Sequence, residues 1–297
     1  MRVQMIGLCR FSYVGQGGYQ VAHPTIEAQR AFVYDPERLA RRWYWFENVT
    51  LPALLRQSDP DFTLVILTGD DLPQPYLSQL RDLADFMPQV RLELRPPGGR
   101  HLAVCADAVL PHISSDADVV GHFRQDDDDA VAVDYIERGK ADFSLLKPVW
   151  QRAKGQAYID YGRGLLLQAH ADGVDVSGHV LYHNVSGLTA YLRPKARKTI
   201  MSFSHFRIAM HMPGLMMNEA AMYVRLLNYD NDSATKGAGH VWGEKGDVDW
   251  QEILARRFMI DLPTLRKGAI DFGLPTALRR DRLAQIRAIG RASAKPQ

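Results

Sequence analysis

The sequence predicts an α/β fold in which helices flank a mostly parallel central sheet. In residues 1–139, short apolar runs of strand length alternate with stretches of helical periodicity, an order typical of parallel sheets. Beyond about residue 140, shorter strand-like runs are separated by glycine and polar turns, which predicts an antiparallel extension. The chain has 297 residues, 46% of them hydrophobic, so it can bury a substantial core.

Four apolar runs in the first half have the length of buried strands. They are residues 3–9, 62–68, 90–94 and 119–123. Apolar residues at helical spacing predict helices between them, over 38–57, 77–86 and about 102–113. Pro52 interrupts the first of these helices and predicts either a kink or a restart capped by Thr50.

The second half of the chain predicts a different arrangement. Segments 158–168, 174–183 and 186–193 read as short strands between glycine-containing turns. Residues 216–228 return to helical periodicity. Neither an internal repeat nor a low-complexity linker divides the chain, so we expect one compact domain.

Acidic residues follow two of the predicted strands. Asp70 lies in the turn after strand 62–68, and four consecutive aspartates, Asp126 to Asp129, follow strand 119–123. The carboxyl ends of parallel strands meet at one edge of a sheet, so the two can share a crevice. Four neighbouring carboxylates resist ionisation unless a positive charge shares the site. Asp126 and Asp128 are two positions apart, so on a tight turn both carboxylates could bind one hard cation. The alternative is an acidic helix start, which one or two aspartates would satisfy.

Two blocks of the sequence resemble a known family. Residues 124–131, Arg-Gln-Asp-Asp-Asp-Asp-Ala-Val, are similar to the Arg-Leu-Asp-Asp-Asp-Asp-Ala-Leu signature of the putative rhamnosyltransferase family of bacterial glycosyltransferases, which have the GT-A fold. Gln125 replaces the usual leucine, and Ala53 replaces a serine in the second block. That block comprises Arg42, Phe46, Glu47, residues 50–54, Gln57 and residues 61–62.

The resemblance implies a GT-A-like fold and a divalent metal, Mn²⁺ or Mg²⁺, at an Asp-x-Asp pair. Asp128 would be the direct ligand, and Asp126 would face the ribose or a metal-bound water. Asp129 would orient the donor sugar or the turn itself. His205 is our choice of third ligand over His211 and His240, and the alternative is a surface or packed histidine.

Further site residues follow from their positions. Asp70 resembles the acidic residue that contacts the nucleotide base, with a turn-forming role as the alternative. Arg10, just past the first strand, could bind the nucleotide or its diphosphate. Arg124 could brace the carboxylates. Glu219 is the predicted catalytic base at the start of helix 216–228, where it could instead favour the helix dipole, with Asp230 and Asp232 as rivals.

The predicted function is metal-dependent transfer of a sugar, rhamnose by the family's label, from a nucleotide diphosphate donor to a saccharide-like acceptor with inversion. Residues 1–139 would bind the nucleotide sugar and residues 140–275 the acceptor. The alternatives are a nucleotidyl or phosphoryl transferase that uses the same acidic site, and a non-catalytic relative that binds glycan or protein.

Composition limits the partners and the compartment. A net charge of +2 is too mild for a nucleic-acid-binding protein. Cys9 and Cys105 lie in apolar stretches, which predicts reduced, buried thiols. With neither a signal peptide nor a long apolar run, a cytoplasmic location is expected. The tail 276–297 has six basic residues and one acid, so it could touch the inner face of a membrane or be a solvated helix end.

Overall fold

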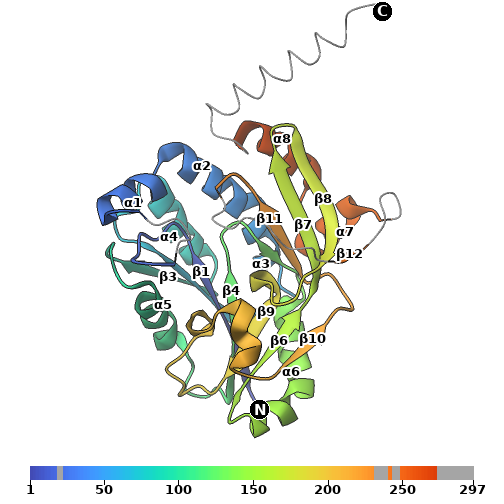
Figure 1. Ribbon diagram of the computed structural model, residues 1–297. Helices are drawn as coiled ribbons and strands as arrows, with labels where there is room; N and C mark the ends of the chain where they lie inside the picture. The colour runs from blue at the N-terminus through green and yellow to red at the C-terminus, as the bar shows by residue number, and fades with distance from the viewer. Residues whose placement is uncertain (19–22, 231–239, 243–247, 273–297) are drawn as a thin grey trace, which may run out of the picture.

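A seven-stranded sheet forms the centre of the computed structural model, which describes residues 1–18, 23–230, 240–242 and 248–272 (Figure 1). The strand order is β10-β6-β9-β4-β1-β2-β3, and β9 is antiparallel to both its neighbours while the other pairs are parallel. The strands are β1 (Val3–Arg10), β2 (Phe62–Gly69), β3 (Val90–Arg95), β4 (Val119–Gln125), β6 (Gln156–Tyr161), β9 (Leu188–Leu192) and β10 (Gly214–Met217). The predicted mostly parallel α/β sheet is confirmed.

Helices cover both faces of this sheet, and β1 shows how the core divides. Met5 and Cys9 join the larger apolar cluster, whereas Ile6 and Leu8 point to a second cluster that contains α5 residues, as the two-residue period of a strand requires. Both predicted thiols are free and buried. The helices of this half are α1 (Ile26–Val33), α2 (Pro36–Trp45), α3 (Leu51–Leu54), α4 (Tyr76–Phe86), α5 (His101–Val109) and α6 (Tyr135–Arg152).

A second sheet of five strands has the order β12-β8-β7-β11-β5. Its β7–β8 hairpin is antiparallel, and α8 packs against it at the upper right of Figure 1. These elements are β5 (Ala130–Val131), β7 (Arg163–His170), β8 (Gly173–Val180), β11 (Tyr223–Leu227), β12 (His240–Trp242), α7 (Trp250–Phe258) and α8 (Leu262–Phe272). Short 3₁₀ turns occupy Leu110–His112, Val185–Gly187, Ile200–Ser202 and His205–Met210. The predicted antiparallel extension is therefore present.

The predicted helix over residues 216–228 is wrong. This segment contains the end of β10 and the whole of β11. Tyr223 and Val224 pair with β5 on one side and with β7 on the other, so tertiary pairing outweighs the helical spacing of the sequence. The predicted strand 158–168 is also two strands, because the chain passes from the first sheet to the second at Gly162.

The predicted helix 38–57 is broken earlier than Pro52. After α2, a π-helical turn (Phe46–Thr50) precedes α3, and the amide of Leu51 donates to the carbonyl of Phe46. Thr50 is not a cap, since its hydroxyl instead donates to the carbonyl of Asp129 at 2.9 Å. The interruption thus connects this helix to the acidic segment.

Within the described ranges, no helix has both the length and the apolar character needed to cross a bilayer. The basic tail 276–297 lies outside the described residues.

Candidate active site

The four aspartates form a turn between β4 and β5, at the carboxyl end of β4. This acidic turn (Asp126 to Asp129) borders a cavity of about 250 Å³ that also reaches the end of β1. Among the described residues, five arginines and five aspartates line the cavity, so its formal charges balance. They are Arg10, Arg38, Arg42, Arg124, Arg225, Asp126, Asp127, Asp128, Asp129 and Asp230.

Arg42 of α2 holds the middle of the acidic turn. Its guanidinium is buried and forms ion pairs with Asp127 and with Asp128, the latter at 2.9 Å from Nη1 to Oδ2. Burial by itself would lower the pKa of Arg42, but the charges of Asp128, Asp230 and Asp126 outweigh it and raise the pKa. Arg42 therefore stays charged, and it supplies a positive partner for the turn from within the protein.

Asp126 has a different partner. Arg124 of β4 binds it through two hydrogen bonds, Nε to Oδ1 at 2.7 Å and Nη2 to Oδ2 at 3.1 Å. Burial would raise the pKa of Asp126, but the Arg124 charge, with those of Arg10 and Arg42, lowers it. The side chain remains 31% exposed, so a carboxylate stays accessible at the cavity wall. Arg124 is therefore the ion-pair partner of one acid of the turn.

Asp129 is turned into the protein. Its carboxyl accepts hydrogen bonds from the hydroxyl of Ser186 at 2.5 Å and from the amide of Leu226 in β11 at 3.0 Å. Burial, together with the charges of Asp128 and Asp126, raises its pKa to about 7. Asp129 thereby connects the turn to β11 and to the 3₁₀ turn before β9.

Residues of α2, of the π-helical turn, of α3 and of the loop after α3 hold the acidic turn and the backbone that follows it. Thr50 bonds the Asp129 carbonyl, and Gln57 donates to the carbonyl of Ala132 at 2.8 Å while accepting from the amide of Ile136 at 3.1 Å. Together with Arg42, these are residues of the second family-like block. The two blocks, about 80 residues apart in the sequence, are therefore in direct contact.

Gln125, a departure from the family signature, also stabilises the turn. Its side-chain amide donates to the carbonyls of Asp126 at 3.0 Å and Asp129 at 2.7 Å. A leucine cannot make these bonds. This chain therefore closes the turn with polar contacts from its own β4 strand.

The predicted site residues fall into two groups. Arg10 and His205 line the cavity with the aspartates, and burial lowers the pKa of His205 to about 4, so its imidazole is neutral at pH 7. Asp70 is exposed at the end of β2, and Glu219 is 63% exposed on the bend between β10 and β11. Neither of these two lines the cavity.

The rival acids and histidines are also placed. Asp230 lines the cavity, but Arg41 holds it through two hydrogen bonds of 2.8 and 3.0 Å. His211 is exposed at the end of the 3₁₀ turn that contains His205. Asp232 and the side chain of His240 lie outside the described residues.

Several site residues were missed by sequence reasoning. Arg38 and Arg225 line the cavity, and Asn228 donates to Asp128 at 2.8 Å. For one further residue of the site, Arg42, the sequence did give a signal, because Arg42 belongs to the second family-like block. That block did not indicate which acids Arg42 binds.

A second cavity of about 330 Å³ adjoins the first and shares Arg124, Val185 and His205 with it. Its other walls come from the start of α5 and from residues 200–204. Both polar and apolar side chains form these walls, and the apolar ones come from several segments. They include Leu102, Leu188, Ile200, Met201 and Phe203.

The first comparison with known proteins decides the family. A family model described as putative rhamnosyl transferase matches residues 4–240. The chain belongs to this family. The predicted family is confirmed by this match. A search of curated proteins finds no match.

Solved structures of low sequence identity are also similar to parts of the chain. The crystal structure of S. aureus TarS 1-349 is 11% identical, with 76% of this chain and 60% of that chain covered and a TM-score of 0.38. The same protein in complex with UDP-GlcNAc gives 10% identity, coverage of 78% and 60%, and a TM-score of 0.37. A putative glucose-1-phosphate thymidylyltransferase from Bacillus anthracis, in complex with a sucrose, is 13% identical, with 74% of this chain and 88% of that chain covered and a TM-score of 0.35. The chain thus spans less than two thirds of TarS 1-349.

The acidic turn could bind a divalent cation only if other groups supplied further oxygen ligands. Over the described part of the chain, no three His, Cys, Asp or Glu side chains group so as to hold a metal ion. Asp126 is accessible, whereas Asp128 already accepts from Arg42 and Asn228. Magnesium is usually held by one or two carboxylates plus substrate phosphates. These residues therefore fit an ion that binds together with a phosphate-bearing substrate.

Proposed function

We propose that this glycosyltransferase moves a sugar from a nucleoside diphosphate donor to a saccharide acceptor, with inversion at the anomeric carbon. The observation that carries the proposal is the acidic turn, braced by arginines in a cavity at the carboxyl ends of β1 and β4. Ligands of open α/β sheets bind at such strand ends. Membership of the family supplies the class of reaction.

The donor diphosphate would lie against the arginines of the cavity. Arg10 and Arg225 line it from opposite parts of the sequence, and a planar guanidinium can bind two phosphate oxygens at once. Three acids of the turn, Asp126 to Asp128, already have arginine partners, so their charges repel a bound anion less. Residues 1–139 would provide most of the donor contacts, and the second cavity, bounded mainly by residues 185–205, would take the acceptor.

Asp126 and Asp128 would hold a divalent cation, Mn²⁺ or Mg²⁺, together with the donor phosphates. Such an ion neutralises charge that develops on the departing diphosphate. Arg42 and Asn228 would keep Asp128 oriented toward the cavity, and Arg124 would do the same for Asp126.

Inversion also requires a base that takes the proton of the acceptor hydroxyl. Glu219, the predicted base, lies outside both cavities, so it would have to move to act. His205 borders both cavities, and its neutral imidazole can face either a cation or the acceptor. A His205→Ala variant separates these roles: loss of metal affinity indicates a ligand, and loss of kcat at saturating metal indicates an acceptor contact.

The proposal is tested by donor turnover. Nucleotide sugars with different bases and sugars, dTDP-rhamnose among them, are supplied with and without Mn²⁺, and the released product is identified. We expect a nucleoside diphosphate from one donor class and at least a 100-fold loss in Asp128→Asn. Asp82→Asn, on the exposed face of α4, is the matched control. Release of pyrophosphate would indicate nucleotidyl transfer instead, and no turnover of any donor would refute the proposal.

A further inference from the structure

Residues 176–218 carry an unbalanced positive charge. Five lysines and arginines occur in this stretch, and the nearest acidic residues in the sequence are Asp175 and Glu219. The five are Arg193, Lys195, Arg197, Lys198 and Arg207, and all of them are exposed. The chain as a whole has a net charge of only +2, so this segment is a local basic region.

Large apolar side chains are exposed in the same segment. Phe206 is 75% exposed and Met210 is 81% exposed, and both belong to the 3₁₀ turn His205–Met210. Residues three apart eclipse in a 3₁₀ helix, so Arg207 and Met210 project from the same side. The charged guanidinium of Arg207 and the apolar end of Met210 therefore both point toward solvent on one side of the turn.

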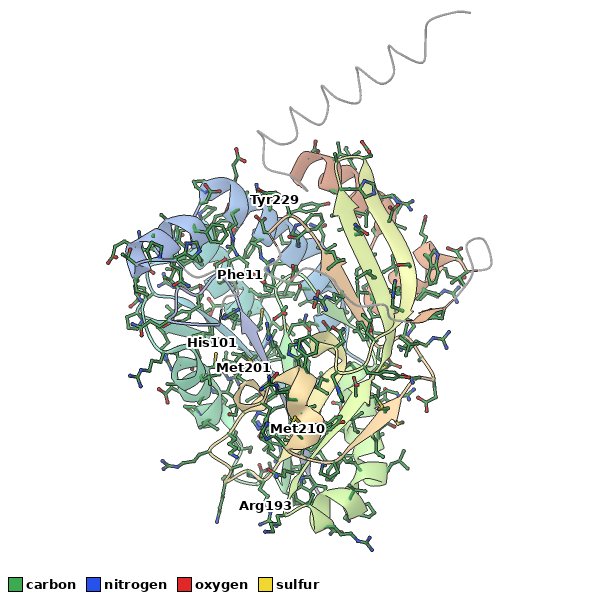
Figure 2. All side chains as sticks on the ribbon, in the orientation of Figure 1. Phe11, His101, Arg193, Met201, Met210 and Tyr229 are labelled. Carbon is green, nitrogen blue, oxygen red and sulfur yellow. The ribbon has the colours of Figure 1, made fainter. Side chains whose placement is uncertain are left out.

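Ring contacts join the two parts of the segment. The ammonium of Lys198 lies 5.6 Å from the ring centre of Phe203, and that ring lies 5.8 Å from the ring of His211. The basic loop 193–198 thus lies near the end of the 3₁₀ turn. Figure 2 shows Arg193 and Met210 in the lower half of the molecule. We call these seven exposed residues the basic–apolar surface: Arg193, Lys195, Arg197, Lys198, Phe206, Arg207 and Met210.

We propose that the basic–apolar surface binds the anionic surface of a lipid bilayer. Basic side chains are attracted to anionic headgroups, each worth about a fivefold gain in binding, and exposed Phe and Met side chains can enter the headgroup boundary. A nucleic acid would match the charge but would leave the apolar side chains in water. The basic tail plays no part in this argument, and neither does the reaction proposed above.

Binding in this way would bring the cavities close to the membrane. Phe206 lines the first cavity, His205 lines both, and residues 200–204 line the second. An acceptor held at the bilayer surface would then have a short path to the active site.

The full chain is tested by co-sedimentation with vesicles of phosphatidylcholine, alone or with about one third phosphatidylglycerol. We expect binding to the anionic vesicles only, weakened by salt. Replacing Lys195, Arg197 and Lys198 with Gln should reduce the partition coefficient about 100-fold. Met210→Ser should reduce it several-fold. Because donor turnover is measured separately on the same samples, failure of either proposal is recognised independently.

The matched control replaces three tail residues, Arg279, Arg280 and Arg282, with Gln, which is the same change in charge. We expect this variant to retain anionic-vesicle binding that exceeds that of the loop variant by at least tenfold. Circular dichroism and thermal unfolding confirm that each variant is folded. Equal losses in the two variants, loss in the tail variant alone, or no binding by the unmodified chain would overturn the proposal.

Discussion

The two sides of the cavity beside the acidic turn are built differently. The acidic turn is fixed by buried ion pairs and by hydrogen bonds from α2, Thr50, β4 and β11, so its carboxylates have defined directions before any substrate binds. The opposite side, residues 200–210, consists of short 3₁₀ turns with exposed side chains such as Phe206. Under the function proposed above, the acidic turn would form a preorganised donor side, which favours catalysis by fixed charges.

The largest effect should come from Arg42→Ala. This substitution leaves Asp127 and Asp128 buried without their main positive partner, and breaking such a pair costs about 3–5 kcal/mol. Chemical denaturation should show this loss, and donor turnover should fall with it. Arg42→Lys restores the charge but not the forked geometry, so it should recover only part of the stability. An unchanged midpoint in the alanine variant would show that the turn is not held by α2.

Asp129 should make stability fall as the pH rises. Its folded-state pKa of about 7 exceeds the ordinary value near 4, so the folded chain holds a proton that the unfolded chain has lost between these values. The stabilisation is therefore complete below about pH 4 and is lost as the pH rises through 7. The free energy of unfolding, measured as a function of pH, should fall less steeply in Asp129→Asn than in the wild type. Burial also raises the pKa of Asp160 to about 7, so some slope should persist. A slope identical to the wild type would contradict the prediction.

Thr50→Val should have a smaller effect on the same side. The valine keeps the shape but loses the hydrogen bond to the carbonyl of Asp129, at a cost of about 1 kcal/mol. Thermal unfolding measures this, and kcat should fall more than the affinity for donor because the turn is less well oriented. Thr63→Val in β2 offers a control threonine outside the site. Loss of affinity alone would argue against an orienting role.

The smallest effect is expected on the exposed side. Met210→Ser should change the free energy of unfolding by less than about 0.5 kcal/mol, because the side chain is already in water. Urea denaturation provides the comparison with Arg42→Ala. A destabilisation as large as that of the α2 variant would remove the distinction between the two sides.

The sheet and the position of the acidic turn were predictable because local patterns determine them. Apolar runs in the sequence predicted β1 to β4. The four aspartates follow β4 directly, so they had to lie at the carboxyl end of that strand. The helix predicted at 216–228 failed because β11 takes its conformation from partners in β5 and β7, which are distant in the sequence.

The partners of the acids could not be predicted for the same reason. Arg42 and Asp127 are 85 residues apart, and no periodicity relates them. The sequence suggested a cation for the turn, and three of its acids have arginine as their positive partner. Glu219 was chosen from its place in a helix that does not form, so its separation from the cavities follows from the same error.

The directions in which Arg42 and Thr50 point depend on the number of residues in the π-helical turn between α2 and α3, more than on which residues these are. In an uninterrupted α-helix, two residues eight apart, such as Arg42 and Thr50, differ in direction by about 80°. The wider turn at Phe46–Thr50 takes up much of this angle, so both side chains reach the same group of aspartates. Shortening this stretch by one residue would rotate one of them away, even if every apolar contact were kept.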